Sequence, residues 1–394
     1  MKAPSSFAVF VGSAFILAGC TLAPFYHRPA LPVRDQWDAP AVSSETIASD
    51  IGWRDFFTDA RLQKLIELAL LNNRDLRIAS LNVAAARAQY RIQRADLFPT
   101  IDATAGEIAQ RQPNLYNIPG YPLTTHEYQA GIGFTAYEFD LFGRIRSLNK
   151  RALELYFSLA ETRTSAQITL VSEVAAQYLT WLADQELLRL TKDTLTGQES
   201  SFDLTNQRFK NGVATELDLS QAKTAVDVAR ANLAQYTRQV MQDKNALTFL
   251  VGATIPDDLP AGNTFNDEAV LATLPAGLPS DLLERRPDVR AAEFQLRAAN
   301  ANIGAARAAF FPSISLTGDF GTASAHLDGL FKSGSRAWVF NPQVSVPIFA
   351  GGANMANLNL ANIEKNVQIA QYEKNDSDGF PRSLRRAGGT ENVG

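Results

Sequence analysis

The sequence holds few side chains whose types and spacing could support catalysis or metal binding. Its three histidines, His27, His126 and His326, are scattered and lack the short spacings typical of a metal site. No phosphate-binding loop is present, and Gly351-Gly352 follows a predicted strand without the rest of a dinucleotide fingerprint. The serines lack the nucleophile elbow of hydrolases. We therefore expect no enzyme activity, no cofactor and no metal.

The densest group of charges is Glu284, Arg285, Arg286 and Asp288, at the start of a predicted helix. Carboxylates and guanidinium groups this close in sequence are more typical of structural ion pairs than of a catalytic site. The net charge is -4 and the pI about 5.6, without a basic patch, which argues against a nucleic-acid partner.

The single cysteine, Cys20, is the side chain most clearly placed for chemistry, and no intrachain disulfide is possible. An apolar segment from Phe7 to Leu17 follows Lys2, and the sequence then reads Leu-Ala-Gly-Cys at 17–20. These features resemble a bacterial lipobox, in which the cysteine thiol is acylated and becomes the mature N-terminus. The alternative is an ordinary signal peptide with a chance cysteine. We predict lipidation at Cys20 and, because Thr21 is no acidic retention signal, sorting to the outer membrane.

A long internal repeat determines the expected architecture. Residues 75–101 match residues 288–314 at a constant offset of 213, with 11 identities in 27 positions and no gap. Self-similarity at a long period indicates one structural unit built twice. Each copy reads as a helix that stops before the sequence Phe-Pro, at 98–99 and 311–312, followed by a hairpin of strands. In the first copy, a preceding amphipathic helix runs from Trp53 to Leu71 and breaks at Asn72-Asn73.

The hairpins show apolar residues at alternate positions, which predicts strands with one apolar face. The alternating residues are Tyr128, Ala130, Ile132, Phe134 and Ala136 in the first copy, and Trp338, Phe340, Val344, Val346 and Ile348 in the second. Such alternation with aromatic residues is a weak signature of membrane strands, and a soluble two-layer sheet is the alternative. The longest apolar run, Phe7 to Ala18, is too short for a transmembrane helix, which needs roughly 20 residues. Four strands cannot close a barrel, so three chains would have to pool twelve.

Between the hairpins lies a very long helical pattern. It has no proline from Gly143 to Leu250 and a single turn at Gly212-Val213-Ala214-Thr215. The outgoing helix would be about 68 residues, or about 100 Å. The returning helix shows the spacing of a coiled-coil seam, at Leu219, Ala222, Val226, Ala229, Leu233, Tyr236, Val240 and Leu247. Two apolar faces on the outgoing helix indicate neighbours on both sides, as in the wall of a helical tube.

Several motifs in order resemble the outer-membrane efflux proteins of the TolC type, and within them the lipoprotein branch typified by OprM and NodT. They are Cys-Thr-Leu-Ala-Pro at 20–24, Trp-Arg-Asp-Phe-Phe at 53–57, Leu-Phe-Gly-Arg at 141–144, Leu-Leu-Glu-Arg-Arg-Pro-Asp-Val-Arg-Ala-Ala-Glu at 282–293 and Ile-Gly-Ala-Ala-Arg-Ala-Ala-Phe-Phe-Pro-Ser-Ile at 303–314. The resemblance implies a homotrimer in which each mainly α chain with β gives four strands to a 12-stranded outer-membrane barrel and helices to a periplasmic α-barrel. It implies a passive exit duct for drugs or other small molecules. Its partners would be a membrane-fusion adaptor, contacted through Gly212, Val213, Ala214 and Thr215, and an inner-membrane pump.

The expected segments follow from the repeat and the resemblance. They are a signal peptide 1–19, a lipidated tether 20–52, first-repeat helices 53–99, a first hairpin 100–142, a long helical hairpin 143–250, a connector 251–286, a second-repeat helix 287–312, a second hairpin 313–350, the start of a second long helix 351–374 and a divergent tail 375–394.

The tail is expected to break the second long helix after Lys374, because the helix-breaking residues Asn375, Asp376, Gly379 and Pro381 follow. We expect a frameshift near codon 374 and a C-terminally truncated chain that lacks the gate residues of the family. A naturally divergent terminus is the alternative. Other readings are a non-functional truncated homologue, a structural or adhesive trimeric envelope lipoprotein and a lipid-anchored envelope enzyme. The spacing of about 200 residues between the hairpins argues against the adhesive, and the missing catalytic site against the enzyme.

Overall fold

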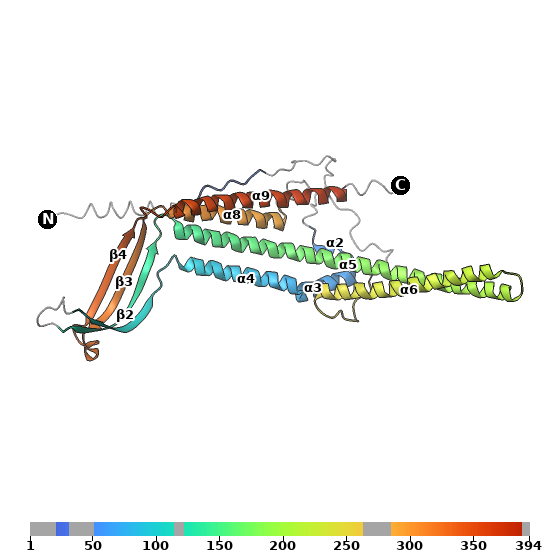
Figure 1. Cartoon of the computed structure of the whole chain (residues 1–394), viewed down its shortest axis with the longest axis horizontal. Helices are drawn as coiled ribbons and strands as arrows, with labels where there is room; N and C mark the ends of the chain where they lie inside the picture. Colours follow the sequence, from blue (N-terminus) through green and yellow to red (C-terminus); the bar gives the residue numbers. More distant parts are fainter. Residues whose placement is uncertain (1–20, 31–50, 114–121, 263–284, 388–394) are drawn as a thin grey trace. The chain divides into compact units, whose positions relative to one another are not determined.

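The computed structural model describes residues 21–30, 51–113, 122–262 and 285–387, with side chains up to Asn375 (Figure 1). The chain divides into two compact units. The first comprises residues 1–32, 84–158 and 291–378, and the second comprises 33–83, 159–290 and 379–394. Four helices contribute residues to both units, namely α4 (Arg74–Ala95), α5 (Arg144–Lys210), α8 (Pro287–Ala308) and α9 (Ala353–Ala387).

The described residues of the first unit include a four-stranded antiparallel sheet. Its strands are β1 (Asp102–Arg111), β2 (Thr124–Phe139), β3 (Ser313–Ser324) and β4 (Arg336–Ser345), in the order β1-β2-β3-β4. A short 3-10 turn, η3 (Leu327–Gly329), lies between β3 and β4. The two predicted hairpins are confirmed, and the pairing of β2 with β3 joins them into one sheet although they lie far apart in sequence.

The register places the predicted apolar residues in common rows across the sheet. Ala103, Ile132, Phe320 and Trp338 form one such row. A β-bulge interrupts β2 between Phe134 and Tyr137, and Ala136 within it has a φ of 54°. The prediction that Ala136 continues the apolar face is therefore wrong. The extra residue shifts the alternation by one position, so that Tyr137 and Phe139, which pair with Leu316 and Ile314, continue the face instead.

The β2–β3 pairing depends on close approach of the two backbones. A β-carbon at Gly321 would collide with the carbonyl oxygen of Ala130, and one at Gly133 would collide with that of Gly318. Only glycine fits at such positions, and it commonly marks bends or close approach in strands. The bulge is fixed by a hydrogen bond in which the Ala136 amide donates to the Thr317 hydroxyl oxygen at 3.1 Å.

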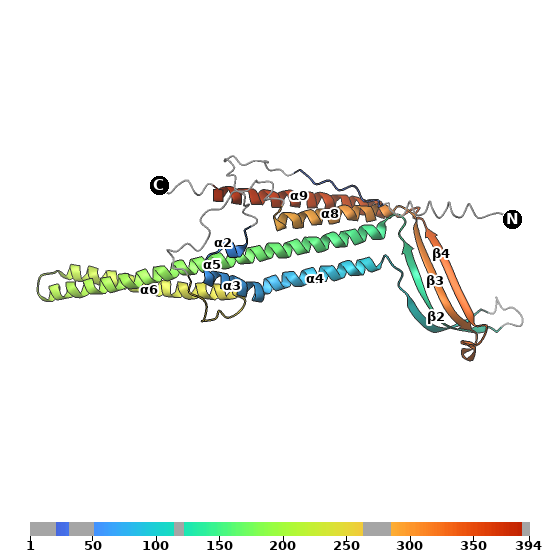
Figure 2. The same cartoon turned by 180° about the vertical axis from the view of Figure 1, so that it is seen from behind.

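Helices α8 and α9, which belong mostly to the first unit, lie side by side there (Figures 1 and 2). Pro287 occupies the first position of α8, where its missing N–H costs nothing. The helix ends before Pro312, as predicted, although four residues earlier than the expected segment. The predicted break of α9 after Lys374 is wrong, because the backbone stays helical to Ala387. An already nucleated helix only has to bear the propensity cost of each added residue.

In the second unit, α2 (Trp53–Phe56), α3 (Ala60–Asn72) and α6 (Glu216–Val251) pack with parts of α4 and α5. The predicted single helix from Trp53 to Leu71 is wrong, because it is two helices. Asp59 interrupts it and caps α3, where its carboxylate accepts the amides of Arg61 at 2.7 Å and Leu62 at 3.0 Å. The break at Asn72-Asn73 is confirmed. The Asn73 side chain accepts the Leu76 amide at 2.9 Å and donates to the Leu250 carbonyl at 2.9 Å.

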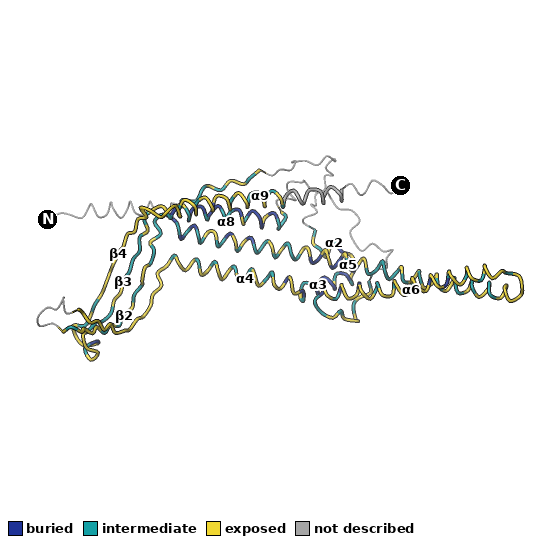
Figure 3. Tube along the Cα trace, in the orientation of Figure 1, coloured by how far each residue is buried: buried dark blue, intermediate teal, exposed yellow. Residues whose placement is uncertain are grey.

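The core of the second unit gathers the apolar face predicted for α3 and residues of α5 and α6. It includes Leu62, Leu65, Ile66, Ala69, Val174, Tyr178, Leu247 and Val251. The predicted seam of α6 is also confirmed, because each of its residues is buried or half-buried, whereas most of the other positions on α6 are exposed (Figure 3). No helix in the described part of the chain is long and apolar enough to cross a membrane.

Candidate functional site

The turn predicted at Gly212-Val213-Ala214-Thr215 joins the end of α5 to the start of α6. Gly212 adopts a left-handed conformation with a φ of 73°. Its amide donates to the Phe209 carbonyl at 2.9 Å, and the Val213 amide donates to the Arg208 carbonyl at 2.9 Å. This pattern is the Schellman motif, which satisfies the last carbonyls of a helix and favours glycine at the left-handed position.

Thr215 closes the other side of the turn with a capping box. The Asp218 amide donates to the Thr215 hydroxyl oxygen at 3.2 Å, and the Thr215 amide donates to the Asp218 carboxylate at 2.8 Å. Hydrogen bonds from the Thr215 backbone and hydroxyl lower the pKa of Asp218. The end of one helix and the start of the next are thus satisfied by hydrogen bonds within residues 208–218, which gives the turn a defined shape.

The turn presents apolar side chains to solvent. Val213 and Leu217 are each 66% exposed, and Leu204 on α5 is 59% exposed. Ala214 is half-buried. Apolar side chains gathered on an exposed surface are typical of protein contact sites. The structure therefore places all four predicted turn residues together on a shaped, partly apolar end of the helical hairpin.

The sheet has two faces of different character. The apolar face carries exposed Ile132, Phe320, Trp338, Phe340 and Val344. The opposite face carries Asp102, Thr104, Gln129, Ser315, Thr317, Asp319, Asn341 and Gln343, and none of its described strand positions is Lys or Arg. Exposed aromatic rows on one face and polar rows on the other match the pattern of strands between lipid and water.

A compact junction connects β2 to α5. The Arg144 guanidinium donates to both carboxylate oxygens of Glu138, at 2.8 and 2.5 Å. Asp140 accepts the amides of Ile145 at 3.2 Å and Arg146 at 2.8 Å, and so caps the start of α5. Gly143 has a φ of 75°, which permits the sharp change of direction between strand and helix.

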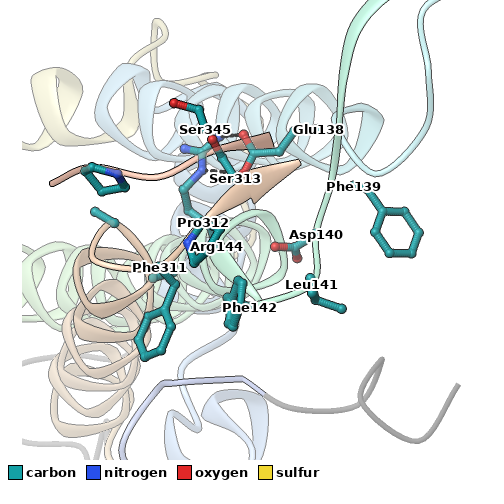
Figure 4. Close-up of a pocket in the computed structure, with 13 residues that line it drawn as sticks. Glu138, Phe139, Asp140, Leu141, Phe142, Arg144, Phe311, Pro312, Ser313 and Ser345 are labelled. Atoms are coloured by element: carbon teal, nitrogen blue, oxygen red, sulfur yellow. Dashed lines mark hydrogen bonds and ion pairs between the residues drawn. The ribbon is translucent and has the colours of Figure 1, made fainter. Parts of the chain in front are cut away.

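A cavity of about 320 Å³ opens at this junction (Figure 4). The ring of Phe142 stacks on that of Phe311 with 4.8 Å between centroids. The other apolar residues of its lining are Phe139, Leu141, Ala308, Ala309, Pro312 and Pro347. Sequence reasoning singled out Leu141-Phe142-Gly143-Arg144 and Phe310-Phe311-Pro312 only as motifs and did not predict that they share a cavity.

Residues 21–30, called the strap below, lie along α8 and fasten to a buried carboxylate. Glu293 is 5% exposed and accepts hydrogen bonds from the Tyr26 hydroxyl at 3.2 Å and from the guanidinium groups of Arg28 and Arg297, each at 2.6 Å. Burial and the neighbouring Glu293 raise the pKa of Tyr26 to about 12. The sequence contains no periodic signal for this contact, because its partners are more than 260 positions apart.

The charged cluster expected at the start of α8 is structural in its described part. The Arg286 guanidinium donates to the Asp288 carboxylate at 3.2 and 2.6 Å. Although burial acts to raise the pKa of Asp288, the hydrogen bonds from Arg286 lower it. Glu284 and the predicted lipidation site Cys20 lie outside the described residues. Among the residues described, no group of His, Cys, Asp and Glu could hold a metal ion.

Comparisons with known proteins agree on one family. The model of the family described as "Outer membrane efflux protein" matches residues 65–253 and 278–378. The chain is 51% identical over 373 residues to a Pseudomonas putida protein named "Probable efflux pump outer membrane protein TtgC", and the match covers 93% of this chain and 77% of that protein.

Solved structures show the same fold. A membrane protein from Pseudomonas aeruginosa is 44% identical with a TM-score of 0.86, and the match covers 93% of this chain and 85% of that one. The open state of the Neisseria gonorrhoeae MtrE outer membrane channel is 39% identical with a TM-score of 0.83, over 92% of this chain and 80% of that one.

Proposed function

Because the chain belongs to the outer membrane efflux protein family, we propose that it forms, as a homotrimer, the outer-membrane exit duct of a tripartite efflux system. The observation that carries this proposal is the four-stranded sheet, which has one exposed apolar face and one polar face. The duct would be passive, because it needs only to guide small molecules such as drugs that a pump delivers.

The sheet of one chain is open at both edges, and this supports a trimer. Strands β1 and β4 are the two edges of the sheet in one chain, so each leaves a row of backbone groups unpaired. In a bilayer every such group must be satisfied by closure of the strands. Three chains with four strands each would supply twelve strands, within the range of outer-membrane barrels. The polar faces would then line the passage and the apolar faces would contact lipid.

The helices support a periplasmic tube. Helix α6, with its seam buried or half-buried, lies beside α5 (Figures 1 and 2). By contrast, α4 exposes Ile78, Leu81 and Ile92, and α9 exposes Leu360, Ile363 and Val367. Apolar stripes on otherwise polar helices are typical of surfaces that pack on a further helix. Neighbouring copies of the chain would cover these stripes.

The turn between α5 and α6 would contact the partners of the duct. Its rigid caps and exposed Val213 and Leu217 fit a surface that docks on the helical hairpin of a membrane-fusion adaptor, which in turn engages an inner-membrane pump. Lipidation of Cys20 would tether the N-terminus in the periplasmic leaflet of the outer membrane.

The test is the mass of the detergent-solubilised full chain together with its conductance in planar bilayers. We expect three copies per particle and single-channel currents. A Val213→Asp variant should keep trimer mass and conductance but lose efflux in cells, since it alters only the exposed turn. Monomers without conductance would refute the duct, and normal efflux by the variant would refute the role of the turn.

A further inference from the structure

We propose that the cavity at the junction of β2 and α5 holds the first part of an acyl chain of the lipid on Cys20. This inference rests on the proposed lipid anchor. It adds a seat on the protein for that lipid, whereas an anchor alone requires only that the acyl chains enter the bilayer.

The start of the strap is held at the ends of α5 and α8. The Thr21 and Ser147 hydroxyl groups share a hydrogen bond at 3.1 Å. Arg307 donates to the Leu22 carbonyl at 3.3 Å. The strap therefore begins on the first turn of α5 and the last turn of α8, and it is held there by side chains of both helices.

The start of the strap packs closely against α8. A β-carbon at Gly304 would lie 2.6 Å from the Ser147 hydroxyl oxygen and 2.8 Å from the β-carbon of Ala23. Such distances leave no room for a side chain at position 304. The Asn300 amide also donates to the Pro24 carbonyl at 2.8 Å. The strap fits closely against α8 from Thr21 to Pro24, so its first residue has little freedom to move.

The residues that hold the start of the strap are close in sequence to residues that line the cavity. Ser147 lies one helical turn after Arg144, and residues three apart share a face of a helix. Arg307 immediately precedes Ala308. Arg144 and Ala308 both line the cavity. Along both helices, the residues that hold the start of the strap are therefore within three positions of residues that line the cavity.

The cavity lining combines apolar residues with serines. The stacked rings of Phe142 and Phe311, with Pro312 and Ala309, offer an apolar surface for methylene groups (Figure 4). Ser313 and Ser345 also line the cavity, and a serine hydroxyl can donate to the ester carbonyls at the head of an acyl chain. The charges nearby are balanced, because Arg144 pairs with Glu138 and Asp140 pairs with Arg146.

A tethered occupant has an advantage over a free bilayer lipid. Attachment close to a site gives an effective concentration that commonly reaches millimolar values without any new contact. An acyl chain on Cys20 meets this condition as long as the strap stays fastened. The cavity would in turn draw the N-terminus to a fixed place beside the strands.

The test uses cells that express the full chain and are fed a fatty acid with a photoactivatable diazirine. After illumination, protease digestion and mass spectrometry identify which peptides are crosslinked to the N-terminal lipopeptide. We expect crosslinks to peptides containing Phe142 or Phe311 to exceed those to the peptide of exposed Ile92 by about tenfold, the ratio that burial of two methylene groups supplies.

Variants separate the possible occupants. Ala309→Phe, in the turn after α8, fills the cavity and should remove the excess of crosslinks, while Ala306→Phe, at a half-buried position on α8 outside the lining, should keep it. Cys20→Ala should abolish labelling at the cavity. Persistent labelling by free phospholipid in Cys20→Ala would overturn the assignment to the attached lipid. A lipidated N-terminus without crosslinks to the cavity would refute the seat alone, whereas an unmodified N-terminal peptide would refute the lipid anchor and the seat with it.

Discussion

Replacing Glu293 by alanine is expected to release the strap, residues 21–30, from α8. The Glu293 carboxylate accepts hydrogen bonds from Tyr26, Arg28 and Arg297 while only 5% of the residue is exposed. Arg297 also lies over the Tyr26 ring at 5.1 Å from its centroid. One side chain of α8 therefore organises the contacts that hold the second half of the strap.

The magnitude follows from the burial of each partner. Removing one member of a buried ion pair costs about 3–5 kcal/mol, because the other charge is left without compensation. Here the side chains of Arg28 and Arg297 are 40% and 39% exposed, so water can rehydrate part of each guanidinium. We therefore expect a smaller loss, of about 2–3 kcal/mol, in the free energy that holds the strap closed.

Hydrogen exchange measured by mass spectrometry on the strap peptide reads this change directly. Exchange through local opening should accelerate by about 30- to 150-fold for a loss of 2–3 kcal/mol. The matched control is Glu186→Ala on α5. Glu186 also binds one arginine through three hydrogen bonds of 2.6–3.2 Å, but its side chain is 40% exposed and it is remote from the strap in sequence and contacts. That variant should leave strap exchange unchanged. If Glu293→Ala altered strap exchange no more than the control, the reasoning from the buried carboxylate would be refuted.

Three further predictions concern the same strap, the turn and the sheet. Burial acts to raise the pKa of Glu293, but hydrogen bonds from Arg28 and Arg297 lower it. The stabilisation of the strap by this carboxylate is therefore present above the unfolded pKa of about 4.3 and is lost as pH falls through the lower folded value. Strap exchange corrected for intrinsic rates should rise below about pH 4 in the unchanged protein, and not in Glu293→Ala. Thr215→Ala removes the cap of α6 and should destabilise its first turn by about 1 kcal/mol, seen as faster exchange at the amides of Asp218 and Leu219, which donate to Thr215, whereas unchanged exchange would exclude the cap as a contributor. Gly321→Val should prevent β2–β3 pairing because its side chain would collide with the Ala130 carbonyl, so heat-modifiable gel migration of the folded sheet should be lost; normal migration would contradict the close approach.

Local signals in the sequence were sufficient for most helix boundaries. The sequence predicts a break at Asn72-Asn73 and a turn at Gly212, and the structure shows both, because an asparagine cap and a left-handed glycine act on neighbouring backbone groups. The seam of α6 was likewise predictable, since one helical face repeats every three or four residues whatever the partner is.

Expectations failed where a local pattern allowed two outcomes. The apolar spacing from Trp53 to Leu71 continues across Asp59, but the carboxylate of Asp59 caps a new helix and accepts the Tyr178 hydroxyl at 2.9 Å, so the chain is two helices there. Ala136 fits the alternation of β2, yet a bulge opposite Thr317 displaces it. A bulge is decided by the partner strand and its twist, which the alternation of one strand does not encode.

By itself the sequence determined the repeat, the existence of four strands in two hairpins, the long helical hairpin and the shape of its turn. These features depend on periodicity and on contacts between residues a few positions apart. Only the tertiary structure decided that β2 pairs with β3, that the strap fastens to Glu293, and that Phe142 and Phe311 enclose one cavity. Those contacts join residues separated by more than 160 positions, and their partners are selected by the packing of whole elements, which leaves no periodic trace in the chain.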